Sequence, residues 1–259
     1  MKKLSTEPYK GVRDFYPEDQ FVQRYILEHM ARTSEMFGYE EYNASILEPA
    51  ELYRTKTSDE IVNDQTYTFV DRGDRDRELP MPYRLYSIPN CFRYERTQKG
   101  RLREFWQLNA DIVGAPGIEA DAEIIALAHA ILRNYGADER MFEIRVSDRR
   151  MLEAAYDACN VQAETRSETT RLLDRRDKLE DFDSQLTALI GEDSAKQLID
   201  HFDRTVSTAY LEELRGMLSV MGVTNMVVDT KITRGFDYYT GMVFEVFDTS
   251  GENRRSIFG

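Results

Sequence analysis

The chain has 259 residues, of which 41% are hydrophobic, and its formal net charge is −13 at pH 7. A chain of this length can bury a sizeable core, whereas the negative charge excludes a protein that binds nucleic acid over its whole surface. The two cysteines, Cys91 and Cys159, have no metal or redox spacing, and there is no run of about 18 apolar residues. We therefore expect a soluble, cytoplasmic protein without a zinc site.

The first part of the chain is predicted to be a helix followed by short strands. Residues 18–37 place apolar side chains at helical spacing after Pro17, and Gly38 is expected to end this helix. Residues 39–49 are expected to be extended, and residues 65–72 alternate as a strand does. A polar break rich in charge and proline separates this part from the next.

Two strands, residues 83–96 and 103–114, are predicted to form a hairpin, joined by a loop in which Gly100 permits a positive φ. Alternate positions of a strand point to opposite faces. In the first strand, Phe92 and Tyr94 are expected on the core face, opposite Arg93 and Glu95. In the second strand, the face expected in the core carries Glu104, Trp106, Leu108, Ala110 and Ile112, and the other face carries Arg103, Phe105, Gln107, Asn109 and Asp111.

The remainder of the chain is predicted to be a helix, a strand, a helical region and two final strands. The helix covers residues 118–135 and ends before Gly136, and residues 141–148 form the strand. The final strands flank the segment TRGFDYYTG, residues 233–241. We expect three regions, which are a first part of the core (1–148), a helical connecting or inserted region (149–222), and a second part of the core built as a hairpin (223–259).

The basic residues of the first hairpin allow two interpretations. Arginines on a sheet face are commonly a solvated surface with cross-strand ion pairs. Phe105, however, stands among polar residues, where a ring beside arginines offers a stacking surface for a planar base. The arginine fork also matches phosphate or carboxylate oxygens. The face therefore suits a nucleotide whose phosphates lie along Arg93 and Arg103 and whose base meets Phe105.

The segment TRGFDYYTG also has two interpretations. It can be a tight hairpin with packed tyrosines, or it can place the charge of Arg234 and the hydroxyls of Tyr238 and Tyr239 at a sheet interior. A buried charge would then require a partner or a ligand. The three histidines lie on separate predicted helices without a pattern of nucleophiles, and we assign them structural roles. They are His29, His129 and His201.

Four stretches together resemble the catalytic domain of histidyl-tRNA synthetases, a family of class II aminoacyl-tRNA synthetases. They are GVRDFYP (11–17), the helix and strand ending at Pro49, FRYERTQKGRLREFWQLNADIVG (92–114) and TRGFDYYTGMVFE (233–245). The resemblance runs through nearly the whole chain in the expected order. It implies an α+β fold with an antiparallel sheet flanked by helices, and a homodimer whose interface involves residues 18–49.

The resemblance implies that histidine is activated with ATP and Mg²⁺ to histidyl-adenylate and then transferred to tRNA(His). Class II enzymes stabilise the charge that develops on the α-phosphate with positioned cations, without a covalent nucleophile. The implied catalytic residues are Arg93 and Arg234, and no resident metal is implied. The implied ATP-binding residues are Arg93, Glu95, Arg101, Arg103 and Phe105, and the implied histidine-binding residues are Gln107, Asp111, Tyr238 and Tyr239.

The sequence departs from the family pattern in two places. The family's Arg-Pro-Glu-x-Thr loop has no counterpart in GDRDRELPMP (73–82), and the third class II motif and the anticodon-binding domain do not follow RRSIFG (254–259). We therefore expect an incomplete catalytic domain. These departures favour an alternative, a synthetase-like regulatory subunit of ATP phosphoribosyltransferase in histidine biosynthesis. The retained arginines and tyrosines favour the ligase, and a dimer without catalysis is a third interpretation.

Overall fold

The computed structural model describes residues 8, 10–43, 81–93, 102–176, 179–203, 207–230, 232, 240–251 and 256–259. The chain divides into two compact units, Met1–Pro116 and Gly117–Gly259, and each is described by itself. Within the described ranges, no helix combines the length and the apolar character needed to cross a membrane.

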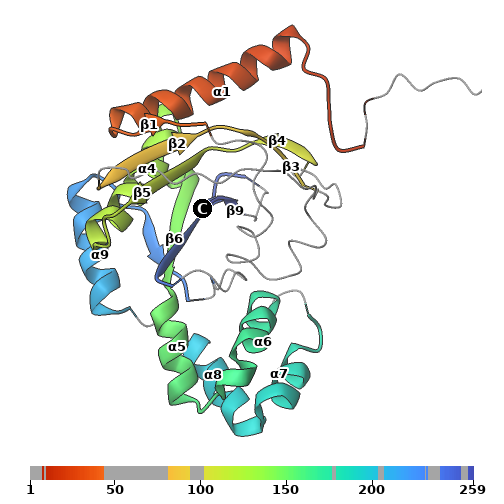
Figure 1. The fold of residues 1–259 in the computed structure, drawn as a ribbon. Coiled ribbons are helices and arrows are strands. Elements are labelled where there is room, and N and C mark those ends of the chain that lie inside the picture. The colour runs from red at the N-terminus through yellow and green to blue at the C-terminus, as the bar shows by residue number, and fades with distance from the viewer. Residues whose placement is uncertain are drawn as a thin grey trace, which may run out of the picture. The chain divides into compact units, whose positions relative to one another are not determined.

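The first unit is a long helix beside a small sheet (Figure 1). Helix α1 (Pro17–Met36) ends as predicted, and Gly38 follows it with a φ of +81°. Strand β1 (Glu40–Glu41) pairs in parallel with β2 (Tyr83–Ser87), which pairs antiparallel with β5 (Asn109–Val113). Tyr86 is buried, and its hydroxyl donates to Glu35 of α1 at 3.1 Å. Helix α1 therefore lies on the face of the sheet to which Tyr86 points.

The predicted hairpin is confirmed, but it is divided into two ladders. Strand β3 (Asn90–Phe92) pairs antiparallel with β4 (Glu104–Trp106), while β2 pairs with β5. A single register runs through both ladders, because the Gln107 amide donates to the Pro89 carbonyl at 3.3 Å between them. Proline has no N–H to donate to a ladder, which accounts for the break at Pro89. The strand predicted at 65–72 and the loop with Gly100 lie outside the described residues.

The N-terminal segment before α1 covers the same face of the hairpin as α1 does. The ring of Phe15 meets the Trp106 indole edge-on, with ring centroids 5.4 Å apart. The Gly11 carbonyl accepts hydrogen bonds from the amides of Arg103 at 2.8 Å and Glu104 at 3.2 Å. Phe92 was expected in the buried row of this face, and that expectation is wrong, since its exposure is 61%.

The second unit is built around a four-stranded sheet in the order β7-β6-β8-β9. Strand β6 (Phe142–Asp148) pairs in parallel with β7 (Met226–Val228) and antiparallel with β8 (Met242–Asp248), and β8 pairs antiparallel with β9 (Ser256–Phe258). The two strands that flank TRGFDYYTG were predicted to form a hairpin, and this is wrong, because β7 and β8 lie on opposite sides of β6. Apolar alternation identifies strands, but it does not identify their neighbours.

One face of this sheet forms the core of the unit. Ile144 and Val146 of β6 and Val246 of β8 have no exposed surface. Helix α4 (Ile118–Asn134), which was predicted, ends before Gly136 with a φ of +88° and packs against α9 (Ala209–Val220). Both helices bury apolar side chains, and such burial is the main source of stability in a folded chain.

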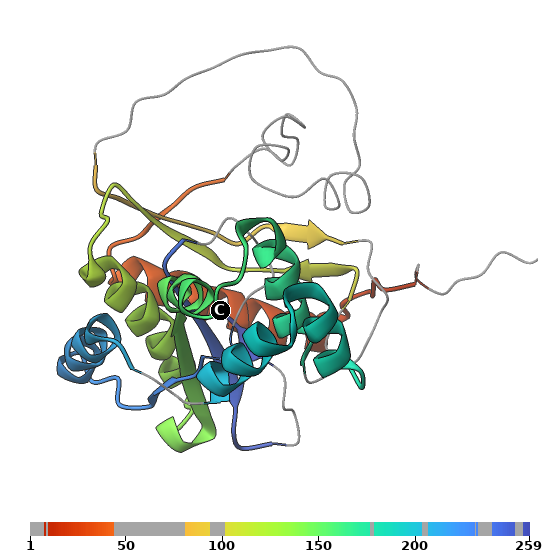
Figure 2. The ribbon, with the colours of Figure 1, turned by 90° about the horizontal axis from the view of Figure 1, so that it is seen from below.

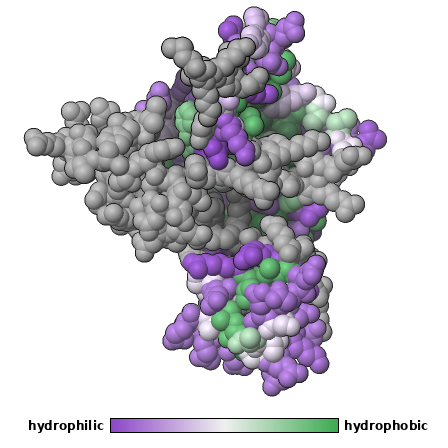
Figure 3. All heavy atoms as spheres, turned by 90° about the vertical axis from the view of Figure 1, so that its right-hand side faces the viewer, coloured by the Kyte–Doolittle hydropathy of each residue, from purple (hydrophilic) through white to green (hydrophobic). Residues whose placement is uncertain are grey.

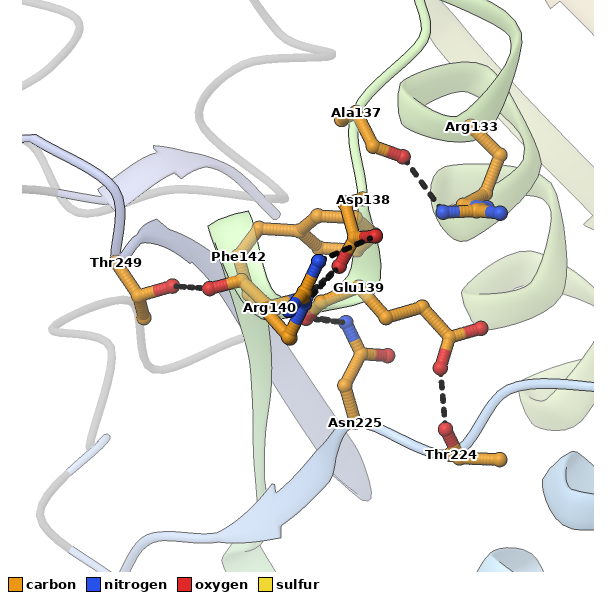
Figure 4. Close-up of polar contacts among 9 residues, drawn as sticks. All are labelled: Arg133, Ala137, Asp138, Glu139, Arg140, Phe142, Thr224, Asn225 and Thr249. Carbon is orange, nitrogen blue, oxygen red and sulfur yellow. Dashed lines mark hydrogen bonds and ion pairs between the residues drawn. The ribbon is translucent and has the colours of Figure 1, made fainter.

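A network of polar contacts joins the end of α4 to the ends of three strands (Figure 4). The Glu139 carboxylate, in the 3₁₀ helix η1 (Glu139–Met141), accepts from the Thr224 hydroxyl. The Asn225 side chain donates to the Phe142 carbonyl at 2.9 Å, and the Thr249 hydroxyl donates to the Arg140 carbonyl at 2.7 Å. These bonds satisfy backbone groups that leave the ladders here.

The described part of the region 149–222 is mostly helical, as predicted. Its helices are α5 (Arg149–Ala158), α6 (Ala163–Asp174), α7 (Phe182–Ile190) and α8 (Glu192–Asp203), followed by α9. Helices α5 to α8 share a separate core in which Ala155, Tyr156, Leu186 and Leu198 have no exposed surface. They form one group when seen from below in Figure 2, and hydrophilic side chains cover much of their surface in Figure 3.

Candidate active site

The structure describes five of the predicted site residues. These are Arg93, Arg103, Phe105, Gln107 and Asp111. The other five, Glu95, Arg101, Arg234, Tyr238 and Tyr239, lie outside the described residues. The structure therefore bears on the hairpin half of the predicted site.

All five described residues lie on one face of the hairpin. The register places Cys91 opposite Phe105 and Leu85 opposite Asp111, and the Arg93 amide donates to the Arg103 carbonyl at 2.8 Å. Residues directly opposite in an antiparallel pair point to the same side. Tyr86 and Trp106, which contact α1 and the N-terminal segment, point to the other side. The candidate face is therefore the one that α1 does not cover.

The Arg93 guanidinium is the centre of the contacts on this face. It lies over the ring of Phe105, 4.6 Å from the centroid, and donates to Gln107 Oε1 at 3.2 Å. Arg93 and Gln107 are exposed, whereas Phe105 is half-buried. A planar cation and an aromatic ring are thus in contact on an accessible surface, which is an arrangement that can bind a phosphate and stack a base.

The N-terminal segment holds the backbone of Arg103 in place. The carbonyl of Gly11 accepts from two successive amides, those of Arg103 and Glu104, which belong to the edge of the β3–β4 ladder. Such bonds fix the direction of the strand and hence the face to which each side chain points. The GVRDFYP stretch, singled out in the sequence, therefore contributes to the orientation of Arg103.

Two further residues belong to this face, although sequence reasoning assigned neither of them a role. Cys91 is half-buried beside Phe105, and burial raises the pKa of its thiol, while the nearby Arg93 lowers it. Because the net shift is upward, the thiol is protonated at neutral pH and is a poor nucleophile. Asn109 accepts a hydrogen bond from Gln107 Nε2 at 2.6 Å. Strand register was the signal that could have placed both residues beside Phe105 and Gln107.

In the second unit, the described residues that lead into TRGFDYYTG are fixed by an ion pair. The Arg145 guanidinium donates to Asp229 at 3.2 Å and lies 4.2 Å from the centroid of the Phe247 ring. The Asp229 amide also donates to the Val146 carbonyl at 2.9 Å. Asp229, which follows β7, is therefore held against β6 by both its side chain and its backbone.

Away from the hairpin face, the described residues line one small cavity and include no group that could hold a metal ion. A cavity of about 20 Å³ lies at the end of β6, where Asp148, His201 and Thr230 are among its lining residues. Its volume suffices for about one water molecule. Among the described residues, no group of three histidine, cysteine or acidic side chains could hold a metal ion.

The comparisons with known proteins agree on one family. Residues 75–255 match the family model described as histidyl-tRNA synthetase. The histidine–tRNA ligase of Leptospira biflexa is 38% identical over 295 residues, which cover all of this chain and 68% of that protein. The histidine–tRNA ligase of Thermoplasma volcanium is 34% identical, covering 99% of this chain and 68% of that protein. The one from Natronomonas pharaonis is 33% identical, with coverage of 96% and 66%.

The length of the first match bears on the expected missing loop. The match runs over 295 residues, whereas this chain has 259. At least 36 residues of the Leptospira protein within the matched region therefore have no counterpart in this chain. This difference supports the expectation that the chain lacks a segment present in its relatives.

Solved structures share the fold. An ATP phosphoribosyltransferase regulatory subunit/histidyl-tRNA synthetase from Bacillus halodurans has a TM-score of 0.72 at 20% identity, covering 98% of this chain and 75% of that one. A histidyl-tRNA synthetase from Nostoc has a TM-score of 0.68 at 19% identity, with coverage of 94% and 65%. The predicted α+β fold, with antiparallel sheets and flanking helices of the class II kind, is therefore confirmed.

Proposed function

Because this chain belongs to the histidyl-tRNA synthetase family, we propose that it is a histidine–tRNA ligase catalytic domain, which activates histidine with MgATP to histidyl-adenylate and transfers it to tRNA(His). The chain spans about two thirds of the length of the curated relatives that it matches. The proposal therefore concerns the chemistry of the activation site.

The observation that carries this proposal is the contact of Arg93 with both Phe105 and Gln107. In the proposed complex, the Arg93 fork binds the α-phosphate, Phe105 stacks on the adenine, and Gln107 accepts a hydrogen bond from the substrate amine. The three groups already lie together on one accessible face. Attack of the histidine carboxylate on the α-phosphate releases pyrophosphate, and a positioned cation stabilises the charge that develops there.

The remaining site residues are assigned by the family motifs. Glu95 would meet the adenine edge, Arg101 and Arg103 would follow the phosphates, and Arg234 would be the second catalytic arginine. Asp111, Tyr238 and Tyr239 would complete the histidine pocket, because carboxylate and phenol groups can pair with the two imidazole nitrogens. The Mg²⁺ enters with ATP as part of the substrate.

We also propose that the protein is a cytoplasmic homodimer and that α1 contributes to the interface. The sequence predicted an amphipathic helix here, yet Phe21, Val22 and Tyr25 are 71%, 55% and 46% exposed in the single chain. Neighbouring apolar side chains exposed on one helix are typical of a surface that another chain covers. A second copy of this chain would bury them.

The alternative is a regulatory subunit of ATP phosphoribosyltransferase, and one observation favours it. The Bacillus halodurans protein, which is described both as such a subunit and as a synthetase, shares this fold. Against it stands the sequence, because a subunit that only senses histidine has no need for phosphate-binding arginines. The chain retains Arg93, Arg103 and Arg234.

The direct test is histidine-dependent exchange of pyrophosphate into ATP, measured for this chain and for a version that carries the family's missing loop. Exchange by the chain supports the ligase. Exchange by the loop-carrying version alone also supports it, and shows that activity requires the loop. No exchange by either protein contradicts it. Co-purification with a short ATP phosphoribosyltransferase would instead support the regulatory subunit.

A further inference from the structure

Three side chains on the candidate face form a directional chain of hydrogen bonds. The Arg93 guanidinium donates to Gln107 Oε1 at 3.2 Å, and Gln107 Nε2 donates to Asn109 Oδ1 at 2.6 Å. Arg93 comes from the residue after β3, and Asn109 is the first residue of β5. The amide of Gln107, in the link between β4 and β5, connects them.

Donor and acceptor chemistry fixes the orientation of the Gln107 amide. A guanidinium has only donors, so the end of Gln107 that faces Arg93 must be the oxygen. The nitrogen end then points the other way and requires an acceptor, which Asn109 Oδ1 supplies. Without an acceptor at position 109, the amide would lose the bond that holds its nitrogen away from Arg93, and it could turn by half a rotation about its last torsion.

The same oxygen has a second use in the proposed reaction. The ammonium group of an amino acid is also a pure donor, so it too requires Gln107 Oε1, which Arg93 occupies in the ligand-free chain. Because an amide oxygen has two lone pairs, Gln107 Oε1 can accept from the amine beside Arg93, or in its place once the guanidinium has moved to the phosphate. An amide turned the wrong way would present its N–H groups to two cations.

Asn109 is also an unexpected residue for its position. It lies in a strand, opposite the buried Ser87, where β-branched residues are favoured and asparagine is not. Local departures from sequence preference of this kind are expected where a side chain serves a site.

We propose that Asn109 is a positioning residue, which holds the Gln107 amide with its oxygen toward the place shared by Arg93 and the substrate amine. This inference rests on the proposed function for the identity of the amine, but the hydrogen-bond chain can be tested without it. Asn109→Leu removes the acceptor while keeping the number and branching of the side-chain heavy atoms, and Asn109→Asp keeps an acceptor oxygen in the same place. Asn90→Leu is the matched control, because Asn90 donates to Glu104 on the opposite face of the same hairpin at 2.9 Å.

The first measurement is the NMR signal of the Gln107 side-chain amide in protein labelled with ¹⁵N in glutamine side chains, assigned with Gln107→Glu. In the wild-type chain, we expect one of the two amide protons to be shifted and slow to exchange with solvent. Asn109→Asp and Asn90→Leu should retain this signature, and Asn109→Leu should lose it. A signature unchanged in Asn109→Leu overturns the proposal, whether or not the chain is active.

The second measurement is histidine-dependent pyrophosphate exchange, in the chain or in the loop-carrying version if only that version is active. Asn109→Leu should raise the KM for histidine by about 10-fold or more, the size of one lost hydrogen bond to a charged group. The KM for ATP should change much less, and Asn109→Asp should restore the KM for histidine. The proposal is overturned if Asn90→Leu raises the KM for histidine as much as Asn109→Leu does, or if Asn109→Asp does not restore it. If neither the wild-type chain nor its loop-carrying version is active, only the proposed function is contradicted.

Discussion

Replacing Phe105 by alanine is predicted to weaken ATP binding while leaving the fold intact. Stacking of a base on an aromatic side chain contributes about 1–3 kcal/mol. In the ligand-free chain, however, the Phe105 ring already lies 4.6 Å from the Arg93 guanidinium, and an exposed contact of this kind contributes about 0.5–1 kcal/mol. The variant loses the stacking in the complex and the Arg93 contact in the free chain, so the net loss of binding energy is the difference between them. This difference is about 0–2.5 kcal/mol with a midpoint of about 1.25 kcal/mol, or about 8-fold in the Kd of ATP.

Calorimetric titration with MgATP measures this change, and two variants serve as controls. Phe105→Leu keeps an apolar side chain but has no aromatic face, so it should bind ATP as weakly as Phe105→Ala. Phe92→Ala removes a ring that is 61% exposed on the opposite face of the same hairpin and should bind like the wild type. Stacking by Phe105 is refuted if Phe105→Leu retains full affinity, or if Phe92→Ala loses as much.

Three further predictions concern stability and are measured by urea unfolding. Leu198→Ala removes a side chain with no exposed surface from the core of α5 to α8 and should cost about 2–5 kcal/mol; a cost below about 1 kcal/mol would contradict the packing. Gly38→Ala should cost about 1–2 kcal/mol, because φ is +81° even though a Cβ would meet nothing within 4 Å. Gly216→Ala, inside α9, should instead stabilise the fold by up to about 1 kcal/mol, because alanine is the better helix former. Equal effects at the two glycines would refute the backbone argument. Burial lowers the pKa of His129, although the Glu139 carboxylate 3.3 Å away opposes this shift. Protonation therefore favours the unfolded chain, and the free energy of unfolding should fall as the pH drops below about 6.5. Glu139→Gln should steepen this fall and His129→Gln should flatten it; parallel pH profiles would contradict the assignment.

Local elements of the fold were predictable because their signals are local. Apolar spacing together with Gly38 and Gly136 identified α1 and α4, and alternation identified the hairpin and both of its faces. The exposure of Phe21 was not predictable, because spacing shows that a helix face is apolar but does not show which surface covers it.

Long-range pairing and side-chain contacts were less accessible from the sequence. Strand β6 inserts between β7 and β8, although about 80 residues separate β6 from β7, and no local pattern encodes that crossover. In the candidate site, motif resemblance identified Arg93, Phe105 and Gln107. The role of Asn109 required the direction of two side-chain hydrogen bonds, which a sequence does not encode locally.

The central claim is that the hairpin face carrying Arg93 binds ATP. The most direct measurement is a calorimetric titration of the chain with MgATP, compared with Arg93→Ala. We predict saturable binding at one site per chain, and a Kd raised by at least about 10-fold in the variant, because a charge-assisted contact with the phosphate is lost. No binding by the wild-type chain, or equal binding by the variant, would contradict the claim.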